Sequence, residues 1–174
     1  VNPGDRTVRC GAGVITEQLQ QFAEEQGLYY PVDFASSGSS QIGGNISTNA
    51  GGIKVIRHGM TRDWVAGIKL VTGTGELLDL NRGLIKNNAG YDLRQLVIGA
   101  EGTLGIVVES TMRLDSAPQN LAVLVLGSPD MAATMQVRAS FHEELELSAF
   151  ELFSELAMQK VVEHKGLQRP FDTA

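Results

Sequence analysis

A stretch without any ionisable side chain runs from Phe34 to Ile53 and is rich in glycine, serine, threonine and asparagine. Glycine lets a backbone approach a ligand closely and adopt positive φ, so that successive N–H groups point into one concavity. Hydroxyl and amide side chains add further donors, and carboxylates, which would repel phosphate, do not occur in the stretch. This glycine-rich run (residues 34–53) therefore indicates a loop that binds a diphosphate. The alternative is a pair of glycine turns that link core strands.

Two familiar phosphate-binding loops do not explain the glycine-rich run. The sequence has no G-x-x-x-x-G-K-[ST] pattern and no G-x-G-x-x-G pattern that opens a helix. A nucleotide-binding fold of another kind is therefore required. The content of glycine and asparagine also disfavours a regular helix within the run.

The elements that must position the run follow from local patterns. A helix is expected to begin at Thr16 as its N-cap and to end near Gly27. A second, short helix is expected with Asp92 as its cap and with Leu93, Leu96 and Val97 on its buried side. Strands are expected where the pattern alternates or is apolar, at residues 6–14, 65–71, 76–80 and 103–114. The second and third of these are expected to form a β-hairpin around the turn residues 72–75.

A turn-like break at residues 117–120 is the best candidate domain boundary, dividing the chain into residues 1–117 and 118–174. The charge balance changes there: residues 54–113 contain eight Lys/Arg and six Asp/Glu, whereas residues 114–174 contain four and nine. A β-α-β-α order is expected after the break, with strands at 121–127 and 145–153 and helices at 129–141 and 154–166.

Composition excludes several classes of protein. The 174 residues are 43% hydrophobic and 20% charged, as in a globular protein, and the net charge of −6 argues against a nucleic-acid partner. No apolar stretch is long enough to span a membrane, and no signal peptide is visible. The single cysteine, Cys10, excludes an internal disulfide, so we expect a reducing, cytoplasmic location. Because the chain does not begin with methionine, we expect it to be an internal piece of a longer protein.

Three blocks in fixed order carry a family resemblance: "PVDF…GSSQIGGNISTNAGG", "RHGMTRDWVAGIKLVTGTGELLD" and "KNNAGYDLRQLVIGAEGTLGIV". From about Thr7 to about Gly166 the chain resembles the FAD-linked oxidase family of the vanillyl-alcohol oxidase and p-cresol methylhydroxylase fold. The resemblance is greatest to members that act on D-2-hydroxy acids of the 2-hydroxyglutarate, lactate or glycolate type. It implies an α+β fold in which residues 1–117 form the second lobe of the FAD-binding domain. Residues 118–174 would begin an α+β substrate, or cap, domain.

The resemblance also implies site residues. FAD would be bound without a covalent link, and His58 would be a loop residue near it. The catalytic base and the metal ligands are expected beyond Ala174, so no metal site is expected within the chain. The residues that match cofactor-lining positions of the family are Pro31, Gly38, Ser39, Ile42, Gly43, Gly44, Asn45, Thr48, Asn49, Gly51, Glu101, Gly102, Gly105 and Ile106.

Basic residues give the middle of the chain a small positive excess. We interpret them as solvated charges, and the alternative is that one of them contacts an anionic substrate or the FAD phosphates. These residues are Arg57, Arg62, Lys69, Lys86 and Arg94.

The reaction implied for the longer protein is oxidation of a D-2-hydroxy acid to the 2-oxo acid, with hydride transfer to flavin and then electron transfer to an unidentified acceptor. A homodimer is the expected assembly, and the chain alone is expected to be inactive and to retain FAD poorly. Two alternatives are a non-catalytic flavin- or nucleotide-binding module and a purely structural α+β domain. A histidine cluster downstream would distinguish the enzyme from the binding module.

Overall fold

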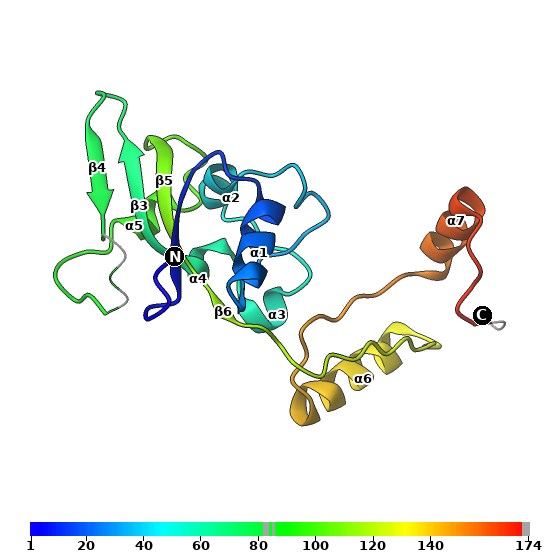
Figure 1. The fold of residues 1–174 in the computed structure, drawn as a ribbon. Coiled ribbons are helices and arrows are strands. Elements are labelled where there is room, and N and C mark those ends of the chain that lie inside the picture. Colours follow the sequence, from blue (N-terminus) through cyan, green and yellow to red (C-terminus); the bar gives the residue numbers. More distant parts are fainter. Residues whose placement is uncertain (82–83, 85, 172–174) are drawn as a thin grey trace. The chain divides into compact units, whose positions relative to one another are not determined.

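The computed structural model describes residues 1–81, 84 and 86–171. The chain divides into two compact units, Val1–Pro118 and Gln119–Ala174 (Figure 1). The predicted segment 118–174 ends in three residues that lie outside the described part. The first unit contains β1 (Thr7–Gly11), α1 (Thr16–Glu25), β2 (Leu28–Tyr29), α2 (Ile42–Thr48), α3 (Val55–His58), α4 (Thr61–Trp64), β3 (Val65–Val71), β4 (Leu77–Leu80), α5 (Arg94–Val97), β5 (Ile106–Arg113) and β6 (Asp115–Ser116). The second contains α6 (Met131–Glu144) and α7 (Glu155–Lys165).

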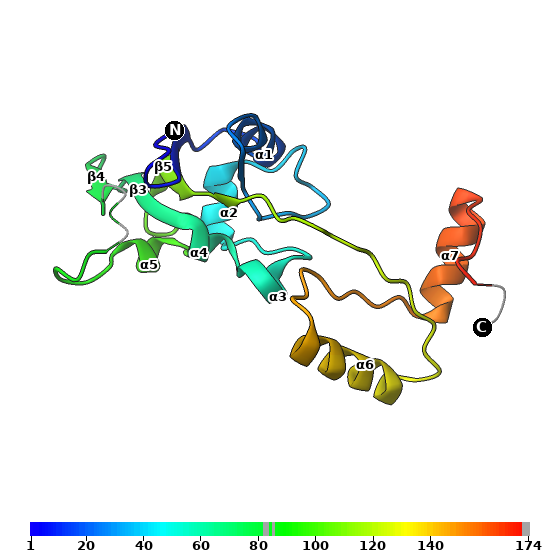
Figure 2. The same cartoon turned by 60° about the horizontal axis from the view of Figure 1, so that its bottom comes forward.

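A four-stranded antiparallel sheet with the order β1-β5-β3-β4 forms the centre of the first unit. In its register Ser110 of β5 lies opposite Cys10 of β1 and Ile68 of β3. β3 and β4 form the predicted hairpin, whose turn is closed by the N–H of Thr72 donating to the carbonyl of Glu76 (2.9 Å). α2 packs against β5, as both views show (Figures 1 and 2). The mixture of helices and strands confirms the predicted α+β class.

The core of the first unit lies between this sheet and the helices α1 and α2. Its fully buried side chains come from loops and helices as well as from strands, so the segments around the glycine-rich run are held by apolar burial. The core residues are Val8, Leu19, Ala23, Tyr30, Val32, Ile42, Ile46, Trp64, Val65, Ile68, Leu70, Leu80, Val97, Ile98, Val107, Met112 and Leu114.

The start of α1 differs from the prediction. Ile15 occupies the N-cap position with extended backbone, and Thr16 is the first helical residue. The Gln18 side chain, rather than a threonine hydroxyl, accepts the N–H of Ile15 (3.2 Å). Thr16 is completely buried, and its hydroxyl serves a tertiary contact described below. The predicted end is confirmed, because α1 stops at Glu25 and Gly27 follows with φ of +69°.

α2 overturns the expectation that the glycine-rich run contains no regular helix. Residues 42–48 are helical although two of the seven are glycine. Ile42 and Ile46, one turn apart, are both completely buried and attach the helix to the core. The hydroxyls of Ser47 and Thr48 donate to carbonyls four residues earlier, at 2.9 and 3.0 Å. Tertiary packing therefore outweighs the low helix propensity of this segment.

α5 is present but buries less than predicted. Leu93, rather than the predicted Asp92, occupies the N-cap position, although the carboxylate of Asp92 accepts the N–H of Arg94 (3.2 Å). Val97 is buried, whereas Leu93 and Leu96 are 47% and 63% exposed. The expectation that both leucine and valine face the core is therefore wrong, because a helix of four residues has only one side that can reach the core.

The second unit contains the two predicted helices but neither predicted strand. Residues 121–127 and 145–153 have no strand structure, and among the described residues neither segment has a strand partner. A strand is stabilised by hydrogen bonds to a neighbouring strand, so an apolar pattern alone does not produce one. The helices form because each carries its own cap: the side chain of Asp130 accepts the N–H of Ala133, and that of Ser154 accepts the N–H of Ala157.

Candidate cofactor-binding site

The start of α2 lies directly on the segment that follows β1. The N–H of Ile42 donates to the carbonyl of Val14 (2.9 Å), and the N–H of Gly43 donates to the carbonyl of Ala12 (2.8 Å). A Cβ added to Gly43 would lie 2.7 Å from the Cβ of Ala12, closer than real Cβ atoms approach. Glycine is therefore required at position 43 by a close approach of two backbone segments.

A serine-rich turn precedes α2 and is fastened to the start of α1. Ser40 donates its N–H to the carbonyl of Ser36 (2.8 Å), and its own carbonyl accepts the N–H of Thr16 (2.9 Å). The N–H of Glu17 donates to the carbonyl of Ser37 (3.1 Å). These bonds fix the backbone of the turn while its tip, formed by Gly38 and Ser39, remains exposed.

A buried polar network holds α2 at its middle. The side-chain amide of Asn45 donates to the hydroxyl of Thr16 (2.7 Å), and the hydroxyls of Thr16 and Ser40 share a further bond (2.7 Å). Asn45 is 4% exposed and Thr16 is completely buried. Buried polar groups that are satisfied in this way specify one arrangement, because any other would leave them unpaired. Asn45 thus positions the loop from inside rather than from its surface.

The two predicted cofactor segments meet at the end of α2. The N–H of Gly99 donates to the carbonyl of Ile46 (3.0 Å), and the N–H of Glu101 donates to the carbonyl of Ser47 (2.8 Å). The bond from Glu101 satisfies the carbonyl of Ser47 at the end of the helix, whereas the carbonyl of Ile46 also accepts the N–H of Asn49 (3.1 Å). Residues 38–49 and 101–106, far apart in the sequence, are therefore parts of one local structure.

Arg62 of α4 reinforces this junction. Its guanidinium donates to the carbonyl of Ile98 (2.9 Å), and its backbone N–H donates to the side-chain oxygen of Asn49 (3.0 Å). Asn49 itself adopts φ of +48° at the C-cap of α2, a conformation that asparagine tolerates better than most residues. Sequence reasoning treated Arg62 as a solvated charge and did not predict that it bridges the two segments.

Burial divides the predicted cofactor residues into two groups. The buried ones shape the loop, and the exposed ones offer their atoms to a ligand. The buried residues are Pro31, Ile42, Gly43 and Asn45. The partly exposed residues are Asn49, Gly102 and Gly105. The exposed residues are Gly38, Ser39, Gly44, Thr48, Gly51, Glu101 and Ile106.

Gly44 is the exposed glycine best suited to a close contact. A Cβ at this position would meet nothing within 4 Å, and the N–H of Gly44 donates no hydrogen bond to another described residue. Gly105 differs, because its added Cβ would lie 2.6 Å from the carbonyl oxygen of Val71. Position 105 therefore needs glycine to fit the protein itself, whereas position 44 leaves both space and a donor for a ligand.

The far end of the glycine-rich run is tied to the segment that contains Pro31. A Cβ on Gly52 would lie only 1.7 Å from the carbonyl oxygen of Asp33. The Nζ of Lys54 lies 2.8 Å from the carboxylate of Asp33 and donates to the hydroxyl of Tyr29 (2.8 Å). Burial alone would lower the pKa of Lys54, but the bonds to Asp33 and Tyr29 outweigh it and raise that pKa above its ordinary value. Only the tertiary structure brings Tyr29, Asp33 and Lys54 together, so sequence reasoning missed this cluster.

His58 packs between aromatic rings at the end of α3. Its ring centroid lies 5.9 Å from that of Tyr29 and 6.2 Å from that of Trp64. Burial is the main cause that lowers the pKa of His58, and the neighbouring Arg57 lowers it further. The other two histidines, His142 and His164, are exposed on α6 and α7. Among residues 1–81, 84 and 86–171, no group of three His, Cys, Asp or Glu residues could hold a metal ion.

An exposed, uncharged glycine surface supported by buried polar bonds can accommodate a diphosphate. The free N–H of Gly44 is a donor, and no carboxylate of the run opposes an anion. The residues therefore fit the phosphate part of a dinucleotide. In the described part of the chain, no helix is both long and apolar enough to cross a membrane.

The comparisons with known proteins agree with this geometry. Residues 1–81 match a family model described as an FAD binding domain. The chain is 65% identical to D-2-hydroxyglutarate dehydrogenase of Stutzerimonas stutzeri (strain A1501), over 99% of this chain and 37% of that protein. It is 40% identical to the mitochondrial D-2-hydroxyglutarate dehydrogenase of Bos taurus, over 92% of this chain and 30% of that protein. It is also 41% identical to D-lactate dehydrogenase of Anaerostipes hadrus, over 68% of this chain and 25% of that protein.

A solved structure gives the same result for the fold. Alkyldihydroxyacetonephosphate synthase matches with a TM-score of 0.60 and 29% sequence identity, over 69% of this chain and 21% of that protein. The resemblance to the FAD-linked oxidase family is therefore confirmed, with residues 1–81 matching the model of an FAD binding domain. The chain spans about a third of the length of the first relatives given above.

Proposed function

We propose that this chain is part of an FAD-dependent oxidoreductase that oxidises a D-2-hydroxy acid to the corresponding 2-oxo acid. The observation that carries the proposal is the junction at the end of α2, where Glu101 and Gly99 bind the carbonyls of Ser47 and Ile46. This junction joins the uncharged glycine-rich run to a second glycine-containing segment, residues 101–106, within a chain whose relatives are named as dehydrogenases of 2-hydroxyglutarate and lactate. When bound, FAD would accept the hydride from C2 of the hydroxy acid.

The residues of the chain would bind and orient the cofactor rather than move protons. Buried Asn45 and Ile42 would hold the backbone of α2, while the N–H of Gly44 would face a phosphate. The exposed hydroxyls of Ser39 and Thr48, which donate to the carbonyls of Ser36 and Gly44 in the structure, would exchange these bonds for bonds to the cofactor. We assign the catalytic base and metal ligands to the part of the full-length protein beyond Ala174. The assigned cofactor residues are those 14 positions from Pro31 to Ile106 that were derived from the family resemblance.

The test of the cofactor site is the pair Gly44→Asp and Gly44→Ala in the full-length protein. Aspartate adds a negative charge where a phosphate would approach, so Gly44→Asp should lose FAD during gel filtration. Alanine fills open space without a charge, so Gly44→Ala should retain more FAD than Gly44→Asp does, with both variants folded by circular dichroism. Stoichiometric FAD in folded Gly44→Asp would refute the assignment.

The substrate is tested by measuring the reduction of an artificial electron-acceptor dye in the presence of D-2-hydroxyglutarate, D-lactate or glycolate. We expect the 2-hydroxyglutarate reaction to be fastest, because the relatives that cover almost the whole chain carry that name. Retained FAD without dye reduction by any 2-hydroxy acid would favour the alternative, a non-catalytic flavin-binding module. The same assay on the 174-residue chain should give no turnover above that of free FAD.

We further propose that residues 1–117 are the second lobe of the FAD-binding domain and residues 118–174 the start of the cap domain. The two compact units support this division, and limited proteolysis should cut first between Ala117 and Asn120. We also propose a cytoplasmic homodimer that passes electrons to an acceptor still to be identified. Sedimentation of the full-length protein and cell fractionation test the assembly and the location.

A further inference from the structure

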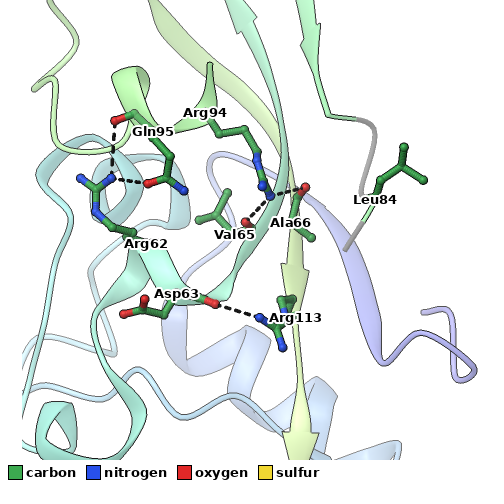
Figure 3. Close-up of a pocket in the computed structure, with 8 residues that line it drawn as sticks. All are labelled: Arg62, Asp63, Val65, Ala66, Leu84, Arg94, Gln95 and Arg113. Carbon is green, nitrogen blue, oxygen red and sulfur yellow. Dashed lines mark hydrogen bonds between the residues drawn. The ribbon is translucent and has the colours of Figure 1, made fainter. Parts of the chain in front are cut away.

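A second polar pocket lies on the first unit, formed by residues to which the proposed cofactor site assigns no ligand. It has a volume of about 240 Å³ and is lined by Arg62, Asp63, Val65, Ala66, Leu84, Arg94, Gln95 and Arg113. Figure 3 shows three arginine side chains that approach it from α4, α5 and β5. Three cations that line one pocket are unfavourable unless other groups compensate their charges, because like charges repel one another.

Two of the three arginines already support the protein around the pocket. Arg94 is paired with the carboxylate of Asp92 (2.7 Å) and donates to the carbonyls of Val65 and Ala66, at 2.8 and 2.7 Å. Those carbonyls lie where the β3–β5 register shifts, so Arg94 satisfies acceptors at an irregular part of the sheet. Arg62 donates to Gln95 and Ile98, which are neutral acceptors. Arg62 therefore holds its neighbours while keeping its positive charge uncompensated.

Arg113 does not support the surrounding protein in this way. It is the last residue of β5 and is exposed, and its side chain has one hydrogen bond within the described part of the chain, a long one (3.5 Å) to the carbonyl of Asp63. No carboxylate among the described residues lies within ion-pair distance of Arg113. Most of its five N–H donors are consequently available.

Among the described residues of the pocket wall, Asp63 is the one carboxylate, and it faces elsewhere. Asp63 uses Oδ2 to accept the N–H of Met60 (2.8 Å). In Figure 3 its carboxylate points away from Arg113, which instead meets its main-chain oxygen. The charges of Arg62 and Arg113 are therefore not neutralised from within the pocket.

We propose that this pocket binds an oxyanion, a phosphate or carboxylate group, at the guanidinium of Arg113. A guanidinium fork matches the oxygens of either group and forms charge-assisted bonds with them. The volume equals that of about eight water molecules in the liquid, enough for a phosphate or a small carboxylate. The oxyanion can belong to a free anion or to the phosphate of a nucleotide. The proposal does not depend on the oxidation of a 2-hydroxy acid.

Calorimetric titration of the full-length protein with inorganic phosphate, and separately with malonate, tests the proposal. We expect binding of at least one of these probes, weakened about tenfold or more by Arg113→Gln, which removes the available charged donor. Arg9→Gln is the matched control, since Arg9 is an exposed arginine of the same sheet whose nearest carboxylate, Glu109, lies 3.9 Å away. The control should bind the probe within about twofold of the original protein.

Titration before and after removal of FAD identifies the source of the oxyanion. Binding only after removal means that a cofactor phosphate occupies the pocket, whereas equal binding means that a separate anion does. Because Arg113 is exposed, Arg113→Gln should melt at the temperature of the original protein, so lost binding cannot be assigned to unfolding. Absence of phosphate and malonate binding in both states, or unchanged binding by Arg113→Gln, would overturn the proposal.

Discussion

The glycine-rich run and the apolar segment 121–127 both contradict their local propensities, in opposite directions. The run contains a helix, α2, although glycine and asparagine disfavour one. The segment 121–127 forms no strand, although five of its residues are leucine or valine. Ile42 and Ile46 of α2 are completely buried, whereas Val123 is 89% exposed. Burial against a partner, rather than local preference, decides which segment becomes regular.

The largest effect should come from placing a charge in each of the two units. Val107→Asp puts a carboxylate at a position 6% exposed in the core of the first unit. An unpaired buried charge is among the most destabilising changes, so we expect a loss of about 3 kcal/mol or more in the free energy of unfolding. Val123→Asp should change it by less than about 0.5 kcal/mol. Urea denaturation of the 174-residue chain measures both, and equal losses would mean that residue 123 is buried after all.

The second comparison lies within α2 itself. Gly43→Ala forces a Cβ to 2.7 Å from that of Ala12, and we expect a loss of about 1–3 kcal/mol from overpacking. Gly44→Ala meets open space and should add about 0.5–1 kcal/mol, because alanine favours a helix more than glycine does. Opposite shifts in urea midpoint are the expected result. Shifts of the same sign would show that close packing does not distinguish the two glycines.

These pairs also show how far the sequence alone can predict the fold. The strands of the sheet, the hairpin turn and the end of α1 followed from alternation and turn residues, which are local signals. The helix α2 could not be predicted in this way, because it depends on Ile42 and Ile46 meeting a core made by distant segments. The strands expected at 121–127 and 145–153 failed for the converse reason, since their pattern was present without a pairing partner among the described residues.

The candidate site divides similarly. The family motifs selected both cofactor segments, but only the structure shows that the N–H of Glu101 binds the carbonyl of Ser47. Arg62 gave no local signal for its bridging role, because a single arginine in a sequence usually denotes a solvated charge. The bonds of Lys54 to Asp33 and Tyr29 likewise join positions up to 25 residues apart. Residue types indicated the chemistry, whereas the supporting contacts required the tertiary structure.

A smaller effect is expected from the titration of His58, which packs beside Tyr29 and Trp64. Burial lowers its pKa below the ordinary value of 6.5 in the folded chain. The unfolded chain therefore binds the proton first as the pH falls, so stability should be complete above pH 6.5 and decrease below it. Because solvent reaches part of the ring, the decrease should be modest. Urea denaturation at pH values from about 7.5 to about 5, which lie on both sides of the ordinary histidine pKa, should show a flatter pH profile of stability for His58→Gln. Identical profiles would exclude His58 as the cause.

Thiol labelling should perturb stability least, and it should show the contrast between the two units most clearly. Burial, followed by the charge of Glu109, raises the pKa of the Cys10 thiol, and the bond to Ser110 opposes this only in part. Since the thiolate is the reactive form, Cys10 should react slowly with iodoacetamide while the first unit is folded.

In a Cys10→Ser background, Val123→Cys places a thiol at a position that is 89% exposed with valine. It should be labelled at least about tenfold faster than Cys10, close to the rate of a free thiol. Adding denaturant should raise the rate of Cys10 to that of the exposed thiol while leaving the latter unchanged. Equal rates without denaturant would mean that the sheet beside β1 opens as readily as the segment 121–127, and that burial does not separate the two regions.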